Sequence, residues 1–270
     1  MAEKNVQASA AFDKVMAARD ANKLTAIDFI ANMFGDRFIE LHGDRRYSDD
    51  KAIIAGLGML YDMPVTVIGI EKGRNTKERM ERNFGQAHPE GYRKALRLMK
   101  QAEKFHRPVL CLVDTSGAYP GIGAEERGQG QAIAENLMEM MTLKTPILTI
   151  LIGEGGSGGA LALAVSDEVW MMENSVYSVI SPEGCASILW KDSSKAPQAA
   201  EALKMTAQDL FSLGVVERII RQPKAEDGAM FESLKLLIGR TFEKNLMLSD
   251  EELTEQRYAR FRKIGTSHIN

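Results

Sequence analysis

Three apolar segments decide the fold that this sequence predicts, namely MPVTVIGI (63–70), RPVLCLVD (107–114) and TPILTILI (145–152). Each has a proline near its head, and successive prolines are 44 and 38 residues apart, which leaves room for a strand, a loop and a crossover helix. Continuous apolar runs, unlike alternating ones, are typical of strands that are buried on both faces. The three segments therefore predict neighbouring strands of a parallel sheet.

Helical periodicity fills the gaps between these segments. Apolar residues recur at i, i+3, i+4 and i+7 in residues 92–99, and at i, i+4, i+7 and i+8 in residues 133–141. The order of strand, loop, helix and strand predicts a parallel α/β core with right-handed crossovers, from about Asp44 to about Arg221.

Both flanks of this core show helical spacing, over residues 6–34 and 228–264. Neither flank has enough apolar residues for a core of its own, so we expect helical additions that cover the core or meet a partner. The predicted organisation is an N-terminal helical segment (1–40), a core (41–222) and a C-terminal helical segment (223–270).

Composition narrows the class of protein. The 270 residues are 44% hydrophobic and 26% charged, which is typical of a soluble globular protein. With 34 basic and 37 acidic side chains, the net charge of −3 argues against nucleic acid or an anionic membrane as partner. The apolar runs fall short of the roughly 20 residues that span a bilayer, and the N-terminus lacks the features of a signal peptide. Two cysteines, both in apolar surroundings, exclude a disulfide framework and a Cys-rich zinc site, so we predict no metal and a cytoplasmic location.

Two glycine-rich loops follow the second and third predicted strands, at residues 114–130 and 153–165. Ligands bind outside the carboxyl ends of strands in open α/β sheets, and both loops lie there. Five glycines fall within residues 153–159, more than a tight turn requires. A loop of this kind that leads into a helix exposes backbone N–H groups that can bind an anion or a developing oxyanion.

Three interpretations of the second loop compete. Residues 153–158 match G-x-G-x-x-G, and Glu173 stands where a ribose-binding acid would, but the motif lies in the third repeat and its helix should end near Ser166. Residues 155–159 match the G-x-S-x-G motif of hydrolases, which requires a histidine base. Only His268 follows this motif in the chain, and nothing in the sequence brings the earlier His88 to it.

The third interpretation needs no nucleophilic side chain. The backbone amides of Gly158 and Gly159 would form an oxyanion hole for a thioester or ureido carbonyl. Composition alone does not select among the three interpretations.

Longer motifs carry a family resemblance. The stretches are GDRRYSDDKAIIAGL (43–57), KGRNTKERMERNFG (72–85), PEGYRKALRLM (89–99), DTSGAYPGIGAEERGQ (114–129), GEGGSGGALAL (153–163) and YSVISPEGCASILWKD (177–192). In this order they resemble the alpha-subunit family of bacterial acetyl-CoA carboxylase carboxyltransferases, over nearly all of residues 37–222. Ser116 departs from the proline that many members have, and the N-terminal flank is shorter than in longer members.

The resemblance implies a crotonase-like (ClpP/crotonase) spiral of ββα repeats with helical extensions. It implies transfer of a carboxyl group from carboxybiotin, on the biotin carboxyl carrier protein, to acetyl-CoA, which forms malonyl-CoA in the first committed step of fatty acid biosynthesis. No cofactor is bound covalently, and a separate biotin carboxylase subunit uses the ATP. The implied partner is a beta subunit with a zinc ribbon, in an α2β2 assembly, without which the alpha chain is inactive.

The resemblance also implies site residues. The biotin enolate takes the proton of the acetyl methyl group, so no protein base is needed, and each subunit supplies one pair of amides. Gly158 and Gly159 match the alpha pair, which we expect to hold the biotin ureido oxygen. The residues expected to bind substrate are Gly117, Ala118, Gly121, Gly123, Gly155, Gly156, Ser157 and Lys191.

Other charged residues have plainer predicted roles. The basic run at 72–82 is expected to be a solvated helix face paired with Glu78 and Glu81, with contacts to CoA phosphates or the partner as the alternative. Glu125 and Glu126 are expected to begin the helix that follows them, where acids suit the helix dipole.

Three other functions stay open at this point. A self-sufficient crotonase-like hydratase or decarboxylase would need acidic catalysts, which the GGALALAV segment lacks. A nucleotide-binding module would bind NAD. A non-catalytic assembly protein would tolerate substitution of Gly158.

Overall fold

The computed structural model describes residues 9–224 and 227–266. Eight strands of the described chain form one sheet in the order β1, β2, β3, β4, β5, β6 and β8, with β7 paired to the end of β5. Their bounds are β1 (Ile39–Glu40), β2 (Ile53–Leu60), β3 (Met63–Ile70), β4 (Val109–Thr115), β5 (Ile147–Gly156), β6 (Glu168–Met172), β7 (Val176–Ser178) and β8 (Arg218–Ile220). From β3 to β8 the neighbouring strands are parallel.

The three predicted strands are confirmed as β3, β4 and β5, which lie side by side. β4 begins directly after Pro108 and β5 directly after Pro146. Proline lacks the N–H that a central strand needs for its ladder, so Pro108 and Pro146 precede their strands and Pro64 is only the second residue of β3.

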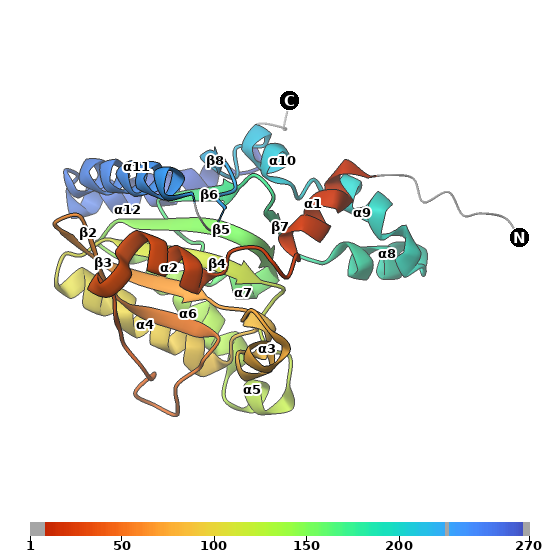
Figure 1. Cartoon of the computed structure of the whole chain (residues 1–270), viewed down its shortest axis with the longest axis horizontal. Coiled ribbons are helices and arrows are strands. Elements are labelled where there is room, and N and C mark those ends of the chain that lie inside the picture. Colours follow the sequence, from red (N-terminus) through yellow and green to blue (C-terminus); the bar gives the residue numbers. More distant parts are fainter. Residues whose placement is uncertain (1–8, 225–226, 267–270) are drawn as a thin grey trace, which may run out of the picture.

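Both faces of the sheet are buried, as continuous apolar strands predict. Along β4, Val109, Cys111 and Val113 pack in one core cluster, and Leu110 and Leu112 pack in the other. Helices α4 (Pro89–Lys104) and α6 (Gln129–Thr142) contribute to the first cluster, and α2 (Ala26–Phe34) and α11 (Gly228–Leu246) to the second. Figure 1 shows α4 and α11 on opposite sides of the sheet.

The flanks are helical as predicted. The N-terminal flank forms α1 (Ala10–Ala18) and α2, and the C-terminal flank forms α11 and α12 (Asp250–Lys263). Residues 6–8 of the predicted flank lie outside the described residues. The division of the chain at residues 40 and 222 stays a prediction.

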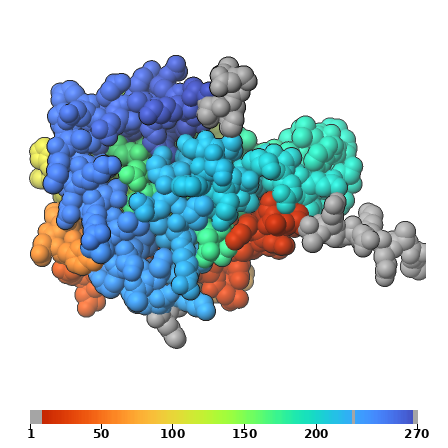
Figure 2. Space-filling model, turned by 90° about the horizontal axis from the view of Figure 1, so that it is seen from above, coloured from red at the N-terminus to blue at the C-terminus, as the bar shows by residue number. Residues whose placement is uncertain are grey.

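One end of the molecule extends beyond the sheet. Here α1 lies beside α8 (Pro182–Trp190) and α9 (Ala196–Leu203), at the right in Figures 1 and 2. Two small clusters, separate from the main cores, hold these helices together. The predicted burial of both thiols is confirmed, since Cys185 lies in one of these clusters and Cys111 lies in the sheet.

Three details differ from the sequence-based expectations. β2 and β3 form an antiparallel hairpin around Tyr61 and Asp62, so the sheet is mixed, and β2, β3 and α4 make one ββα unit. The helix after the second glycine-rich loop, α7 (Ser157–Leu161), ends before Ser166. Glu125 and Glu126 end the short helix α5 (Ile122–Glu126), while α6 begins at Gln129, so those acids do not start it.

The remaining short helices are α3 (Thr76–Glu81) and α10 (Ala207–Ser212), with single 3-10 turns at Gly35–Arg37, Asn83–Gly85 and Ser193–Lys195. Within residues 9–224 and 227–266, no helix combines the length and the apolar character needed to cross a bilayer.

Candidate functional site

The carboxyl ends of β3, β4 and β5 meet at one edge of the sheet because these strands are parallel. Each end carries a charged side chain. Lys72 follows β3, Asp114 is the residue before the last of β4, and Glu154 lies near the end of β5. This edge is where ligands bind in open α/β sheets.

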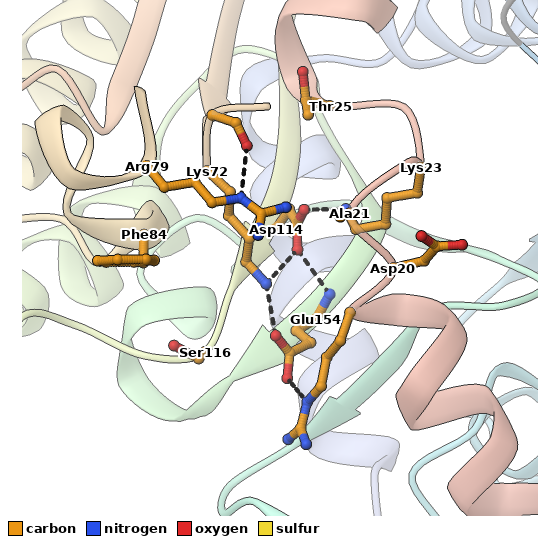
Figure 3. A pocket seen from close by; sticks show the side chains of 12 residues that line it. Asp20, Ala21, Lys23, Thr25, Lys72, Arg79, Phe84, Asp114, Ser116 and Glu154 are labelled. Carbon is orange, nitrogen blue, oxygen red and sulfur yellow. Dashed lines mark hydrogen bonds and ion pairs between the residues drawn. The ribbon is translucent and has the colours of Figure 1, made fainter. Parts of the chain in front are cut away.

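Six charged side chains of alternating sign form a continuous series of ion pairs at this edge, and Figure 3 shows the part of it from Lys23 to Glu154. In order of contact they are Lys23, Asp114, Lys72, Glu154, Arg19 and Glu183, which we call the charge chain. Lys72 Nζ lies 3.0 Å from Asp114 Oδ1 and 2.6 Å from Glu154 Oε2. Arg19 Nε lies 2.7 Å from Glu154 Oε1, and its Nη1 lies 2.7 Å from Glu183 Oε1. The charge chain thus ties the segment between α1 and α2 to three strand ends and to α8.

Burial makes these pairs strong. Only 1% of the Asp114 side chain is exposed. Burial alone would raise the pKa of Asp114, but Lys23 and Lys72 outweigh it and hold that pKa below its usual value. Burial alone would lower the pKa of Lys72, but Asp114 and Glu154 outweigh it and raise that pKa. Both groups are therefore charged at neutral pH.

Two hollows lie on either side of the charge chain. The first, of about 190 Å³, is lined by charge-chain residues together with Arg79 and Phe84. The second, of about 60 Å³, is lined by Gly156, Ser157 and residues 178–182. Arg19, Ser116 and Glu154 line both and form the wall between them.

The second glycine-rich loop is the turn from β5 into α7. Ser157 begins α7 with a left-handed φ of 51°, which is uncommon for a residue other than glycine. In the described part of the chain, the Gly158 and Gly159 backbone N–H groups donate no hydrogen bond. These amides belong to the first turn of a helix, which has no intrahelical acceptor for them. Two donors are thus available to an external oxygen atom.

The two glycine-rich loops touch through their backbones at Ser116–Ala118 and Gly156–Gly159. A Cβ atom on Gly156 would lie 2.2 Å from the Ser116 carbonyl oxygen, and one on Gly159 would lie 2.5 Å from the Ala118 nitrogen. Side chains at either position would push the loops apart. The absence of side chains therefore allows the close contact.

A third hollow, of about 300 Å³, opens beside the free amides. Ser157 and Gly158 lie on its rim, and its walls are apolar, from Tyr177, Val179 and Leu210 among others. An apolar hollow with the Gly158 backbone donor in its lining suits a ligand with an apolar body and one polar oxygen.

Three predicted substrate-binding residues, Gly121, Gly123 and Lys191, do not line any of these three hollows. The Tyr119 ring fills the space beside Gly121, and the Arg127 guanidinium lies beside Gly123. Lys191 ends α8, a helix of nine residues, so it stands about 13 Å along the axis from Pro182 of the second hollow. Gly155, in contrast, lies in the loop and packs against Tyr177.

The competing interpretations find no support in the geometry. His88 stacks on Tyr119 with 4.2 Å between ring centroids, and no histidine lines the hollows described around Ser157. His268 lies outside the described residues. For the nucleotide interpretation, α7 has only five residues, and Glu173 accepts a hydrogen bond from the Gln222 amide at 2.9 Å. In the described residues, no group of histidine, cysteine and acidic side chains could hold a metal ion.

The expectation for the basic run was wrong in part. Lys72 has only 17% of its side chain exposed and belongs to the charge chain, not to a solvated face. Arg74 pairs with Asp28 from α2. Glu78 accepts hydrogen bonds at the start of its own helix and lies near the charges of Arg74 and Arg82, as expected, whereas Glu81 pairs with Lys51 outside the run.

Sequence reasoning assigned no role to Arg19, Lys23, Asp114 or Glu154. A signal was present for the two acids, because each ends an apolar strand that is buried on both faces. Such a carboxylate is unstable unless a cation reaches it. The identity of that cation could not be read from the sequence, since Lys23 and Asp114 are 91 residues apart.

Solved structures share this architecture. A chain of a Pseudomonas malonate decarboxylase hetero-tetramer in complex with coenzyme A matches with a TM-score of 0.71 and 16% identity, over 91% of this chain and 97% of that chain. Transcarboxylase 12S matches with a TM-score of 0.65 and 19% identity, over 82% of this chain and 43% of the longer one. The fold is the crotonase-like fold of carboxyltransferases, which confirms the predicted fold class.

Sequence relatives narrow the class to one family. The chain is 60% identical over 255 residues to the acetyl-coenzyme A carboxylase carboxyl transferase subunit alpha of Ruminiclostridium cellulolyticum, covering 94% of this chain and 98% of that protein. Residues 1–265 match the family described as acetyl co-enzyme A carboxylase carboxyltransferase-like, and the chain belongs to this family. The resemblance seen in the motifs is thereby confirmed.

Proposed function

We propose that this chain is the alpha subunit of a carboxyltransferase that moves the carboxyl group of carboxybiotin to acetyl-CoA and forms malonyl-CoA. The observation that supports this proposal is family membership, with 60% identity to a named alpha subunit over almost the whole chain. Carboxybiotin releases CO2, the biotin enolate takes a proton from the acetyl methyl group, and the resulting carbon nucleophile attacks CO2. The chain's part is to stabilise negative charge on oxygen.

The Gly158 and Gly159 amides are the proposed oxyanion hole, and the biotin ureido oxygen is the proposed ligand. Neither N–H group donates a hydrogen bond in the described chain, and Gly158 lines an apolar hollow of about 300 Å³, which has room for a ring system. Each such donor can contribute about 3 kcal/mol at the transition state. The loop residues Gly117, Ala118, Gly155, Gly156 and Ser157 would shape the surroundings of the ligand.

The proposed partners follow from the same family. A beta subunit with a zinc ribbon would supply the second pair of amides, for the thioester oxygen, in an α2β2 assembly. The biotin carboxyl carrier protein would deliver carboxybiotin, and a biotin carboxylase subunit would make it with ATP.

Reconstitution tests the proposal. Malonyl-CoA formation from acetyl-CoA and carboxybiotin is measured with this chain alone, with a beta subunit alone, and with both. Activity is expected only in the mixture. Activity from this chain alone would contradict the shared site and favour a self-contained crotonase-like enzyme.

A substitution tests the oxyanion hole. A Cβ at Gly158 would lie 3.5 Å from Ile133, an ordinary contact, so Gly158→Val is expected to fold and to assemble with the beta subunit while blocking the amides. We expect the rate of transfer to fall about 100-fold or more. Gly228→Val is the control, because a Cβ there meets nothing within 4 Å. Normal transfer by Gly158→Val would remove the assignment.

A further inference from the structure

A second concentration of charge lies outside the charge chain, between α4 and the loop that precedes β2. It lines a cavity of about 340 Å³. Its basic side chains are Arg45, Arg46, Arg93, Arg97 and Lys100. Only two acidic side chains, Asp44 and Glu135, line the same cavity, so its lining has an excess of positive charge.

Acidic neighbours account for only part of this charge. Arg93 Nε lies 2.8 Å from Asp44 Oδ2, and Lys100 Nζ lies 2.7 Å from Glu139 Oε1 outside the cavity lining. Arg46 reaches Glu135 only at 4.0 Å, the limit of an ion pair.

The other two guanidinium groups, of Arg45 and Arg97, form no ion pair with a described residue. In residues 9–224 and 227–266, no carboxylate oxygen lies within 4.0 Å of Arg45 or Arg97. Both instead donate to the His42 carbonyl oxygen, Arg45 from Nη1 and Arg97 from Nη2, each at 3.2 Å. Arg45 Nη1 and Arg97 Nη2 are therefore separated by at most twice this 3.2 Å.

The fold holds these like charges together. Arg97 Nε also donates to the Gly43 carbonyl oxygen at 3.0 Å, which locks the guanidinium against the loop. Arg45 has a left-handed φ of 64°. Burial and the nearby charge of Arg45 lower the pKa of Arg97, and the opposing charges of Asp49 and Asp44 do not offset them. A carbonyl oxygen accepts hydrogen bonds but does not neutralise two cations.

We propose that this cavity binds a phosphate group of a small ligand, with Arg45 and Arg97 as the paired guanidinium donors. A phosphate carries up to two negative charges and several acceptor oxygens, which matches two forks of N–H donors on one side of a cavity. A volume of about 340 Å³ also has room for the nucleoside of a nucleotide. The site does not rest on the proposed transferase activity, because binding can be measured on this chain alone.

Calorimetry on the full chain tests the site. The probes are inorganic pyrophosphate, adenosine 3′,5′-bisphosphate and coenzyme A, each at low and at physiological salt. Arg45→Ala removes an exposed side chain and Arg97→Gln keeps a donor for the loop, so both variants should fold, which circular dichroism checks. Arg37→Ala is the matched control, since Arg37 is also exposed and bonds to a single carbonyl, that of Tyr61.

We expect at least one probe to bind, with affinity about tenfold weaker or more in Arg45→Ala and Arg97→Gln and unchanged in Arg37→Ala. Binding of all three probes would assign the site to phosphate alone, and binding only of the nucleotides would add recognition of the nucleoside; both support the proposal. No binding of any probe to the native chain would overturn it. So would equal binding by the folded variants, or competition by an acidic peptide with no binding of phosphates.

Discussion

Gly158 and Gly159 are neighbours in the sequence but have different steric surroundings. A Cβ on Gly158 meets only the end of the Ile133 side chain, at 3.5 Å, whereas one on Gly159 would lie 2.5 Å from the Ala118 backbone nitrogen. In our proposal, a ligand needs the backbone amides of both glycines. Gly159 is also needed for the close packing of the two loops, because a side chain there would meet backbone atoms.

Alanine substitutions should separate these two requirements. Gly159→Ala is expected to lower the free energy of unfolding by about 1–3 kcal/mol, because backbone atoms must move. Gly158→Ala should leave it unchanged or raise it by about 0.5–1 kcal/mol, since alanine favours a helix over glycine. Urea denaturation measures both, and equal values for the two variants would contradict the steric argument.

Asp114 is the residue on which the charge chain depends. Asp114→Asn keeps the shape but leaves Lys23 and Lys72 without their shared counter-charge, and should cost about 3–5 kcal/mol of unfolding free energy. Asp20→Asn is the matched control, since Asp20 lines the same hollow but is exposed. If both variants unfold at the same urea concentration, the charge chain does not stabilise the fold.

The lowered pKa of Asp114 gives a pH dependence of known sign. Below its ordinary pKa of about 3.9, the unfolded chain binds a proton at this carboxyl that the folded chain does not. The stabilisation is therefore complete above about pH 4 and is lost as the pH falls toward the lower folded pKa. Native protein should lose more unfolding free energy between pH 5 and pH 3 than Asp114→Asn does, in urea titrations at each pH.

At the scale of elements, Arg257 is one of two buried side chains of α12, the other being Leu253, and it makes polar contacts with the core. Arg257 is fully buried, pairs with Asp167 at 2.8 Å and donates to the carbonyl oxygens of Met140, Leu143 and Thr145. A single guanidinium thus donates hydrogen bonds to carbonyl oxygens at the end of α6 and before β5, and to the Asp167 carboxylate before β6.

Removal of that side chain should weaken the attachment of α12 to the core. Arg257→Ala leaves Asp167 buried without a counter-charge, and we expect a loss of about 3–5 kcal/mol in unfolding free energy. Arg257→Lys should recover little, because an ammonium cannot reach the carboxylate and three carbonyls at once. Arg262→Ala, on an exposed face of the same helix, is the control. Full recovery by lysine would show that charge alone matters.

For the molecule as a whole, the sheet and its two helical layers form the main body, and α1, α8 and α9 extend from one end (Figure 1). The extending helices are held by small clusters, such as Cys185 with Ala186 and Ala199. The charge chain joins the two parts, through the contacts of Arg19 with Glu154 and Glu183.

This unequal packing predicts unequal local stability. Amides of α8 and α9 should exchange with deuterium faster than those of β4, where all side chains are buried, because small clusters open at lower free energy. Arg19→Ala should speed exchange in α8 further, since Glu183 loses its partner, and leave β4 unchanged. Equal protection of the two regions in mass-spectrometric exchange would contradict this division.

The sequence by itself determined the elements whose signal is local. β3, β4 and β5 follow from continuous apolar runs headed by Pro64, Pro108 and Pro146, and α4 and α6 follow from helical periodicity. The long motifs were enough to reach the family and the crotonase-like class. Gly158 and Gly159 could also be singled out, because five glycines in seven residues are a local pattern.

Only the tertiary structure decided which distant groups meet. The β2–β3 hairpin turns the chain at Tyr61, which has a φ of 56°. No pattern in the sequence predicted this turn. The charge chain and the Arg45–Arg97 pair bring together residues from separate elements. The distances between these side chains could not be predicted from the sequence. An ion pair depends on the separation and burial of its partners in space, and the fold of the whole chain sets both.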